Sequence, residues 1–114
     1  NPSDIALHYM EKLKDLKKEY FIAVFLDSKN KVIKDEVISI GTLNSSLVHP
    51  REVFKEAIKC SANSIILVHN HPSGSVEASD EDYRVNKVLI EAGELVGIKV
   101  LDHLIVGDGR WKNI

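Results

Sequence analysis

The chain is poor in cysteine, proline and aromatic residues, and it has no long apolar run. Its single cysteine, Cys60, excludes both an internal disulfide and a zinc site built from several thiolates, and we expect it to be a packed thiol. No stretch approaches the roughly 20 apolar residues that span a bilayer. The start of the chain also lacks a signal-peptide pattern. We therefore expect a cytoplasmic protein with no membrane partner.

An excess of either charge is also absent, because the formal net charge is −2. Such a balance gives no general attraction to nucleic acid or to anionic lipid. The densest lysine cluster lies within residues 12–18, where acidic residues are interleaved with it. This pattern favours a solvated helix face over a phosphate-binding surface.

The composition is that of a globular domain, with 44% hydrophobic and 28% charged residues. A length of 114 residues is enough for one domain with one real core. The chain opens on Asn1-Pro2-Ser3 and not on methionine. We expect residues 1–114 to form a single domain excised from a longer protein.

Hydrophobic spacing predicts strands that alternate with helices after a leading hairpin. The expected helices are 3–17, 51–62 and 79–96, and the expected strands are 19–27, 32–41, 64–69 and 98–106. Ser3 or Asp4 can cap the first helix, and Gly97 can end the last. Residues after 106 are predicted to form a turn and a tail with a partly exposed Trp111. This order predicts an α/β fold with a mixed sheet covered by helices on both faces.

The stretch VHNHPSG, residues 68–74, ends a buried apolar strand with two histidines. Residues two apart on a strand point to the same side, so His69 and His71 should leave the strand end together. Two imidazoles on one side can supply two of the ligands of a metal site.

Catalytic zinc needs a third protein ligand and an open position. Cysteine cannot supply that ligand here, but the helix after the loop begins with three acidic residues, Asp80, Glu81 and Asp82. Any of these carboxylates could face the histidines. Ser79-x-x-Asp82 also has a purely structural interpretation, since it resembles a capping box at a helix start.

The whole pattern, H-x-H-x7-S-x-x-D over residues 69–82, resembles the JAMM signature of MPN+ metalloproteases. The segments FLDSKNKVIKDEVISIGTLNSSLVHPREVF, VHNHPSG and LDHLIVG are similar to the RadC family, and the resemblance runs from Glu19 to Gly107. It implies a three-layer α-β-α sandwich with a mixed sheet, the JAMM/MPN fold, which is cytidine-deaminase-like. One departure is Ala78, where the family often has proline before the motif serine.

The resemblance also implies roles for particular residues. The ligands of one Zn²⁺ per chain would be His69, His71 and Asp82. Ser79 would stabilise an oxyanion. Glu19 would be the general acid/base, with Glu36 as the second choice.

The implied activity is hydrolysis of a peptide or isopeptide bond in a peptide or protein substrate. Zinc lowers the pKa of bound water from ~16 toward ~7, and a carboxylate can carry the proton to the leaving amine.

His103 alternates with apolar neighbours on the last strand, which favours a core histidine. Either His103 or Asp102 could orient a zinc-bound imidazole.

Two other functions stay open at this point. One is an accessory role in DNA repair or recombination, which the RadC resemblance also implies. In that role the domain would act in binding and not in catalysis. The other is an interaction module whose metal site is intact but idle. Specificity for a substrate would reside in the loops at 42–49 and 72–78, next to the expected site.

Overall fold

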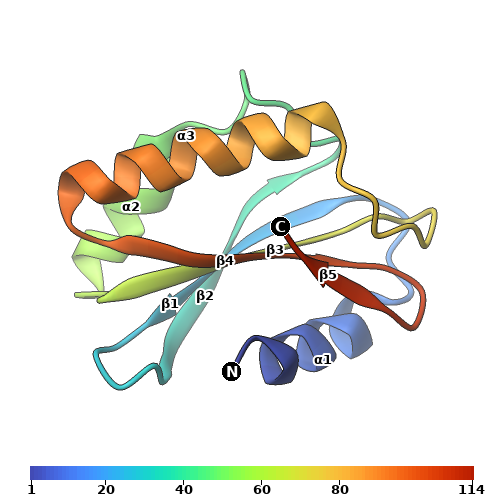
Figure 1. Cartoon of the computed structure of the whole chain (residues 1–114), viewed down its shortest axis with the longest axis horizontal. Coiled ribbons are helices and arrows are strands. Elements are labelled where there is room, and N and C mark those ends of the chain that lie inside the picture. Colours follow the sequence, from blue (N-terminus) through green and yellow to red (C-terminus); the bar gives the residue numbers. More distant parts are fainter.

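Five strands form one mixed sheet with helices on both faces, as the computed structural model of residues 1–114 shows (Figure 1). The elements are α1 (Pro2–Leu13), β1 (Tyr20–Leu26), β2 (Val32–Ile40), α2 (Pro50–Lys59), β3 (Ser64–Asn70), α3 (Asp80–Val96), β4 (Lys99–Val106) and β5 (Trp111–Asn113). The strand order is β2-β1-β3-β4-β5. Only the β3–β4 pair is parallel. Helix α1 covers one face, and α2 and α3 cover the other, which confirms the predicted three-layer α/β sandwich.

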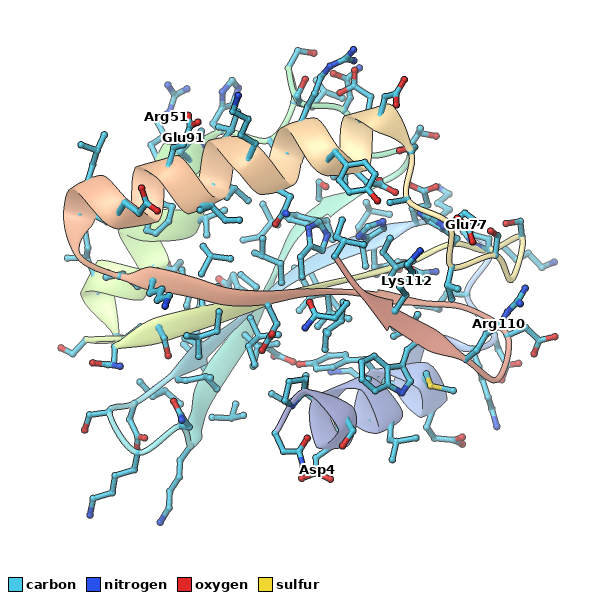
Figure 2. All side chains as sticks on the ribbon, in the orientation of Figure 1. Asp4, Arg51, Glu77, Glu91, Arg110 and Lys112 are labelled. Atoms are coloured by element: carbon cyan, nitrogen blue, oxygen red, sulfur yellow. The ribbon has the colours of Figure 1, made fainter.

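The central strands are apolar on both faces because each face has its own core. In β1, Phe21, Ala23 and Phe25 join a cluster of 15 buried residues shared with α2 and α3. The alternate residues, Ile22 and Val24 among them, join a cluster of 10 buried residues shared with α1. A strand that is covered on both faces reads as a continuous apolar run. Figure 2 shows side chains filling the space between the sheet and the helices on both of its faces.

The first helix begins and ends differently from the prediction. Asn1 caps it, since its Oδ1 accepts from the Ser3 amide at 3.0 Å, and neither Ser3 nor Asp4 is the cap. The helix ends at Leu13 and not at residue 17. After it, the Leu16 amide donates to the Leu13 carbonyl at 3.1 Å, a tight turn in place of the next helical bond. The apolar spacing that continues to residue 16 therefore belongs to the link into β1.

The predicted tail is wrong as well, because Trp111–Asn113 is the edge strand β5, antiparallel to β4. Trp111 is half-buried against the cluster on the α1 side. Helix α2 ends at Lys59, three residues before the predicted end. The Cys60 thiol that follows donates to the Ala57 carbonyl at 3.6 Å and packs on the core, which confirms a packed thiol.

Gly97 ends α3 with a φ of 77°, the left-handed conformation that the sequence predicts. None of the helices is both long and apolar enough to cross a membrane. The end of β3 and the start of α3 meet beside the loop that follows β2. The candidate site lies at this junction.

Candidate metal centre

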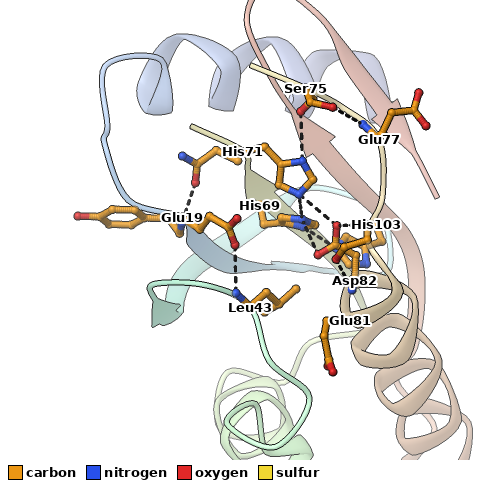
Figure 3. Close-up of polar contacts among 12 residues, drawn as sticks. Glu19, Leu43, His69, His71, Ser75, Glu77, Glu81, Asp82 and His103 are labelled. Atoms are coloured by element: carbon orange, nitrogen blue, oxygen red, sulfur yellow. Dashed lines mark hydrogen bonds and ion pairs between the residues drawn. The ribbon is translucent and has the colours of Figure 1, made fainter. Parts of the chain in front are cut away.

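Three side chains bring their ligand atoms together where β3 ends and α3 begins (Figure 3). The Nε2 atoms of His69 and His71 lie 3.0 Å apart. The carboxylate of Asp82 reaches both rings, with Oδ1 lying 3.2 Å from His69 Nε2 and Oδ2 lying 3.1 Å from His71 Nε2. The two histidines therefore leave the strand on one side, as their spacing predicts. The side chains of His69 and Asp82 are only 1% and 3% exposed.

The start of α3 fixes the direction of the Asp82 carboxylate. Ser79 and Asp82 form a complete capping box: the Asp82 amide donates to Ser79 Oγ at 3.1 Å, and the Ser79 amide donates to Asp82 Oδ2 at 2.9 Å. The structural interpretation of this pair is thus confirmed, and it does not compete with metal binding. The cap orients the carboxylate from a rigid helix start.

The other two acidic candidates lie away from the histidines. Glu81 accepts from the Ser45 amide at 2.9 Å and pairs with Arg84 at 2.9 Å. Asp80 is exposed and does not join the group of ligand atoms. Of the three carboxylates that the sequence offered, only that of Asp82 is close to both imidazoles.

Polar contacts of the two Nδ1 atoms leave both Nε2 atoms available as ligands. His71 Nδ1 lies 3.1 Å from the Ser75 carbonyl, which can only accept, so Nδ1 carries the hydrogen and a neutral ring keeps its lone pair on Nε2. His69 Nδ1 lies 2.9 Å from His103 Nε2. His103 Nδ1 has no hydrogen-bond partner, so the contact with His69 is the one polar contact of that ring. The prediction of His103 as a core residue behind the site is confirmed, whereas Asp102 accepts from the Asn113 side chain instead.

The electrostatics of the group favour an anionic Asp82 carboxylate and a neutral His103 ring. Burial alone would raise the pKa of Asp82, but hydrogen bonds from the two imidazoles and from the Ser79 amide outweigh it and hold that pKa far below its usual range. The pKa of His71 is raised, mainly by its hydrogen bond to Asp82; burial opposes the rise, and the negative charges of Asp82 and Glu19 add to it. Burial lowers the pKa of His103 to about 3, and His69 contributes in the same direction. His103 is thus a neutral partner for His69.

The geometry and the chemistry of this donor set fit a zinc ion. Tetrahedral zinc with bonds of 2.0–2.2 Å to nitrogen and oxygen separates its ligand atoms by about 3.3 Å. The two Nε2 atoms lie 3.0 Å apart and each has one Asp82 oxygen within 3.2 Å, which is close to that spacing. Two imidazoles and one carboxylate are also a ligand set of catalytic zinc sites, in which the fourth position stays open.

Glu19, the predicted acid/base, lies at the rim of the same site. It precedes β1, and its Oε2 accepts from the Leu43 amide at 3.0 Å. Together with His71, Ser79 and Asp82 it lines a depression of about 360 Å³. Glu36 does not line it; that side chain lies on β2, 3.9 Å from Lys34. The structure therefore places Glu19 in one depression with His71 and Asp82 and leaves Glu36 outside it.

Two contributors to the site carry no sequence signal, because they act through the backbone. The Leu43 amide holds the Glu19 carboxylate, and the Ser75 carbonyl holds the His71 ring. Backbone groups are present in every residue, so only the folded path of the chain selects these two. They lie in the loops at 42–49 and 72–78, where substrate specificity is predicted to reside.

Comparisons with known proteins identify one family. The family described as "RadC-like JAB domain" matches residues 1–113. A UPF0758 protein of Clostridioides difficile is 61% identical over 111 residues, which cover 97% of this chain and 47% of the relative. Proteins of the same description from Staphylococcus haemolyticus and Methanosarcina mazei are 54% and 51% identical over all 114 residues, and the match covers 50% of each. The chain thus spans about half the length of these relatives.

Proposed function

The chain belongs to the family of RadC-like JAB domains, and from that premise and the geometry of the metal centre we propose that it is a zinc-dependent hydrolase of peptide or isopeptide bonds. The observation that carries the proposal is the convergence of three ligand atoms, two of whose residues, His71 and Asp82, line one depression together with the carboxylate of Glu19. A metal site that served only structure would need no such group beside an open face.

In this proposal the protein supplies ligands, a base and a hydrogen-bond donor. His69, His71 and Asp82 hold one Zn²⁺, which when bound would polarise the substrate carbonyl and acidify a water molecule. Glu19 takes the proton of the attacking water on Oε1, since Oε2 is engaged by the Leu43 amide. The same oxygen then delivers the proton to the leaving amine.

Ser79 supplies the donor for the developing oxyanion. Its Oγ accepts from the Asp82 amide, which leaves the hydroxyl hydrogen free to donate into the depression. A donor of this kind stabilises the transition state by about 3 kcal/mol in related acyl-transfer sites. Capping and catalysis use different sides of one hydroxyl group, so the two roles of Ser79 are compatible.

The first experiment measures zinc per chain by mass spectrometry after reconstitution, for the intact protein and for Asp82→Ala. We expect one zinc in the intact protein and none in the variant. Asp80→Ala is the matched control, because it removes a carboxylate from the same helix turn without touching the ligand group, and it should bind zinc normally. If the intact protein takes up no zinc, the proposal fails at its first step.

The second step tests catalysis on peptide and isopeptide libraries with the zinc-loaded protein. Glu19→Gln should keep its zinc and lose about 10²- to 10⁴-fold in turnover, the range of general acid–base catalysis. Glu36→Gln is the control and should turn over substrate at the normal rate. Equal activity of Glu19→Gln and the intact protein would remove Glu19 from the reaction.

A further inference from the structure

Asn70 lies between the two histidines, and its side chain points the other way. In β3, Leu67 packs in the cluster shared with α2 and α3, and Val68 packs in the cluster shared with α1. Alternation therefore places His69 on the side of α2 and α3 and Asn70 on the side of α1. There it is buried, with 4% of its surface exposed. A buried carboxamide needs partners for both its donor and its acceptor, and those partners identify its role.

Both partners belong to the backbone that flanks Glu19. Asn70 Oδ1 accepts from the Tyr20 amide at 2.6 Å, and Asn70 Nδ2 donates to the Lys18 carbonyl at 3.0 Å. The carboxamide thus holds the chain immediately before and immediately after the predicted base. We propose that Asn70 is the positioning residue for Glu19, a role that rests on the proposed hydrolase function.

The need for such a contact follows from the strand register. The β1–β3 ladder ends with the pair Phe21 and His69, so no backbone pairing with β3 reaches Glu19. On the β2 side, the Gly41 amide donates to the Glu19 carbonyl at 2.8 Å. Asn70 supplies the missing contact on the β3 side, because a carboxamide carries the same donor and acceptor as a peptide group.

These contacts leave Glu19 little freedom. Its neighbours are held by Asn70, its carbonyl by Gly41, and one carboxylate oxygen by the Leu43 amide. A displacement of about 1 Å at a reacting group can cost about 10²-fold in rate. The stretch His69-Asn70-His71 therefore has two roles. The two histidines offer metal ligands on one face of the sheet, and Asn70 positions Glu19 from the opposite face.

The test begins with a readout that needs no substrate, namely hydrogen exchange of the Leu43 amide measured by NMR. Asn70→Ala should raise this exchange rate about tenfold, toward the rate in Glu19→Ala, which removes the acceptor itself. Asn70→Asp keeps the volume and the acceptor for the Tyr20 amide but loses the donor to Lys18, so it tests the loss of that one contact without a cavity. We expect an intermediate exchange rate for it.

Asp27→Ala is the matched control for the loss of two side-chain contacts to backbone. Asp27 Oδ1 accepts from the amides of Lys29 and Lys31 at 2.8 and 2.9 Å, at the opposite end of β1. This variant should expose those two amides and leave the Leu43 amide protected. Protection of Leu43 in both Asn70 variants would overturn the proposal.

Activity gives the second, independent readout. Zinc content should be normal in Asn70→Ala, while turnover should fall about 10²-fold with little change in KM. In a Glu19→Gln background the same substitution should cost no further activity, because a positioning residue acts only through the group it positions. An additive loss would show a general structural role and contradict the proposal. If the intact protein hydrolyses nothing, the hydrolase function fails. The exchange rate of the Leu43 amide in the Asn70 variants then still shows whether Asn70 holds Glu19.

Discussion

The Nδ1 atom of His69 lies 2.9 Å from the Nε2 atom of His103, and both imidazoles are about 98–99% buried. When His69 offers its Nε2 lone pair to a metal, its Nδ1 carries the hydrogen and donates to His103. The second ring thereby sets the tautomer and the orientation of the first.

His103→Leu should accordingly lower zinc affinity by about 10- to 100-fold, the usual effect of losing the partner behind a ligating histidine. His103→Gln retains an acceptor at nearly the same distance from the backbone, so its affinity should lie closer to that of the intact protein. Competition with a chromophoric chelator measures both constants. Unchanged affinity in His103→Leu would mean that packing alone orients His69.

A second prediction concerns Tyr9 of α1, whose hydroxyl donates to Asp35 Oδ2 on β2. Burial is the largest cause of the raised pKa of Tyr9, and the hydrogen bond to Asp35 adds to it. The folded protein thus favours the neutral phenol more than the unfolded chain does. This contribution to stability is complete below about pH 10, where unfolded tyrosine titrates, and is lost as the pH rises toward the folded pKa.

Urea unfolding at pH 8 and at pH 11 tests this. At pH 8, Tyr9→Phe should be less stable than the intact protein by about 1 kcal/mol, and the difference should shrink at pH 11. Tyr83→Phe, which alters a half-exposed tyrosine on α3, should follow the intact protein at both pH values. A constant difference between Tyr9→Phe and the intact protein would show that this phenol does not titrate differently on folding.

The convergence of His69, His71 and Asp82 was predictable because local geometry determines it. Alternation along a strand brings His69 and His71 to one side, and a capping box aims Asp82 from the next element. Both rules depend on spacing within a few residues, which the sequence displays directly. The resemblance to a known motif then selected Asp82 from three adjacent carboxylates.

The features that sequence reasoning missed depend on distant partners. Strand β5 is three residues long, and it is a strand only because β4 lies beside it. The residues after α1 lead into β1, and the Lys18 carbonyl there is bound by Asn70, which is 52 residues away in the chain. No local propensity encodes such contacts, so the tail and the helix end were both wrongly predicted.

The third prediction concerns Gly107, which follows β4 and faces the turn that carries His71. A Cβ atom at Gly107 would lie 2.3 Å from the Gly74 carbonyl oxygen. Gly74 in turn donates its amide to the His71 carbonyl at 2.9 Å, so pressure on Gly74 displaces the turn that aims His71. Gly107→Ala should therefore lower zinc affinity about tenfold or more, and it should also lower stability by about 1–3 kcal/mol.

Gly93→Ala provides the control for the stability loss. Its Cβ would lie 2.4 Å from the Ile98 carbonyl oxygen, a clash of the same kind at the far end of α3. Both variants should show a lower Tm, but only Gly107→Ala should weaken zinc binding in the chelator assay. A parallel loss of affinity in Gly93→Ala would attribute the effect to general destabilisation.

The fourth prediction separates the two roles of Ser79. As an N-cap, serine is replaced by alanine at a cost of about 1 kcal/mol but by glycine at a cost of only a few tenths. Both substitutions remove the hydroxyl that would donate to the oxyanion. If Ser79 acts in catalysis, Ser79→Ala and Ser79→Gly should lose turnover equally, by about 10²- to 10³-fold, although their stabilities differ. If it is only a cap, activity should follow stability, and Ser79→Gly should remain close to the intact protein. Thermal unfolding and turnover measured on the same zinc-loaded samples distinguish the two outcomes. A catalytic role predicts equally low turnover in both variants, whereas a capping role predicts higher turnover in Ser79→Gly than in Ser79→Ala.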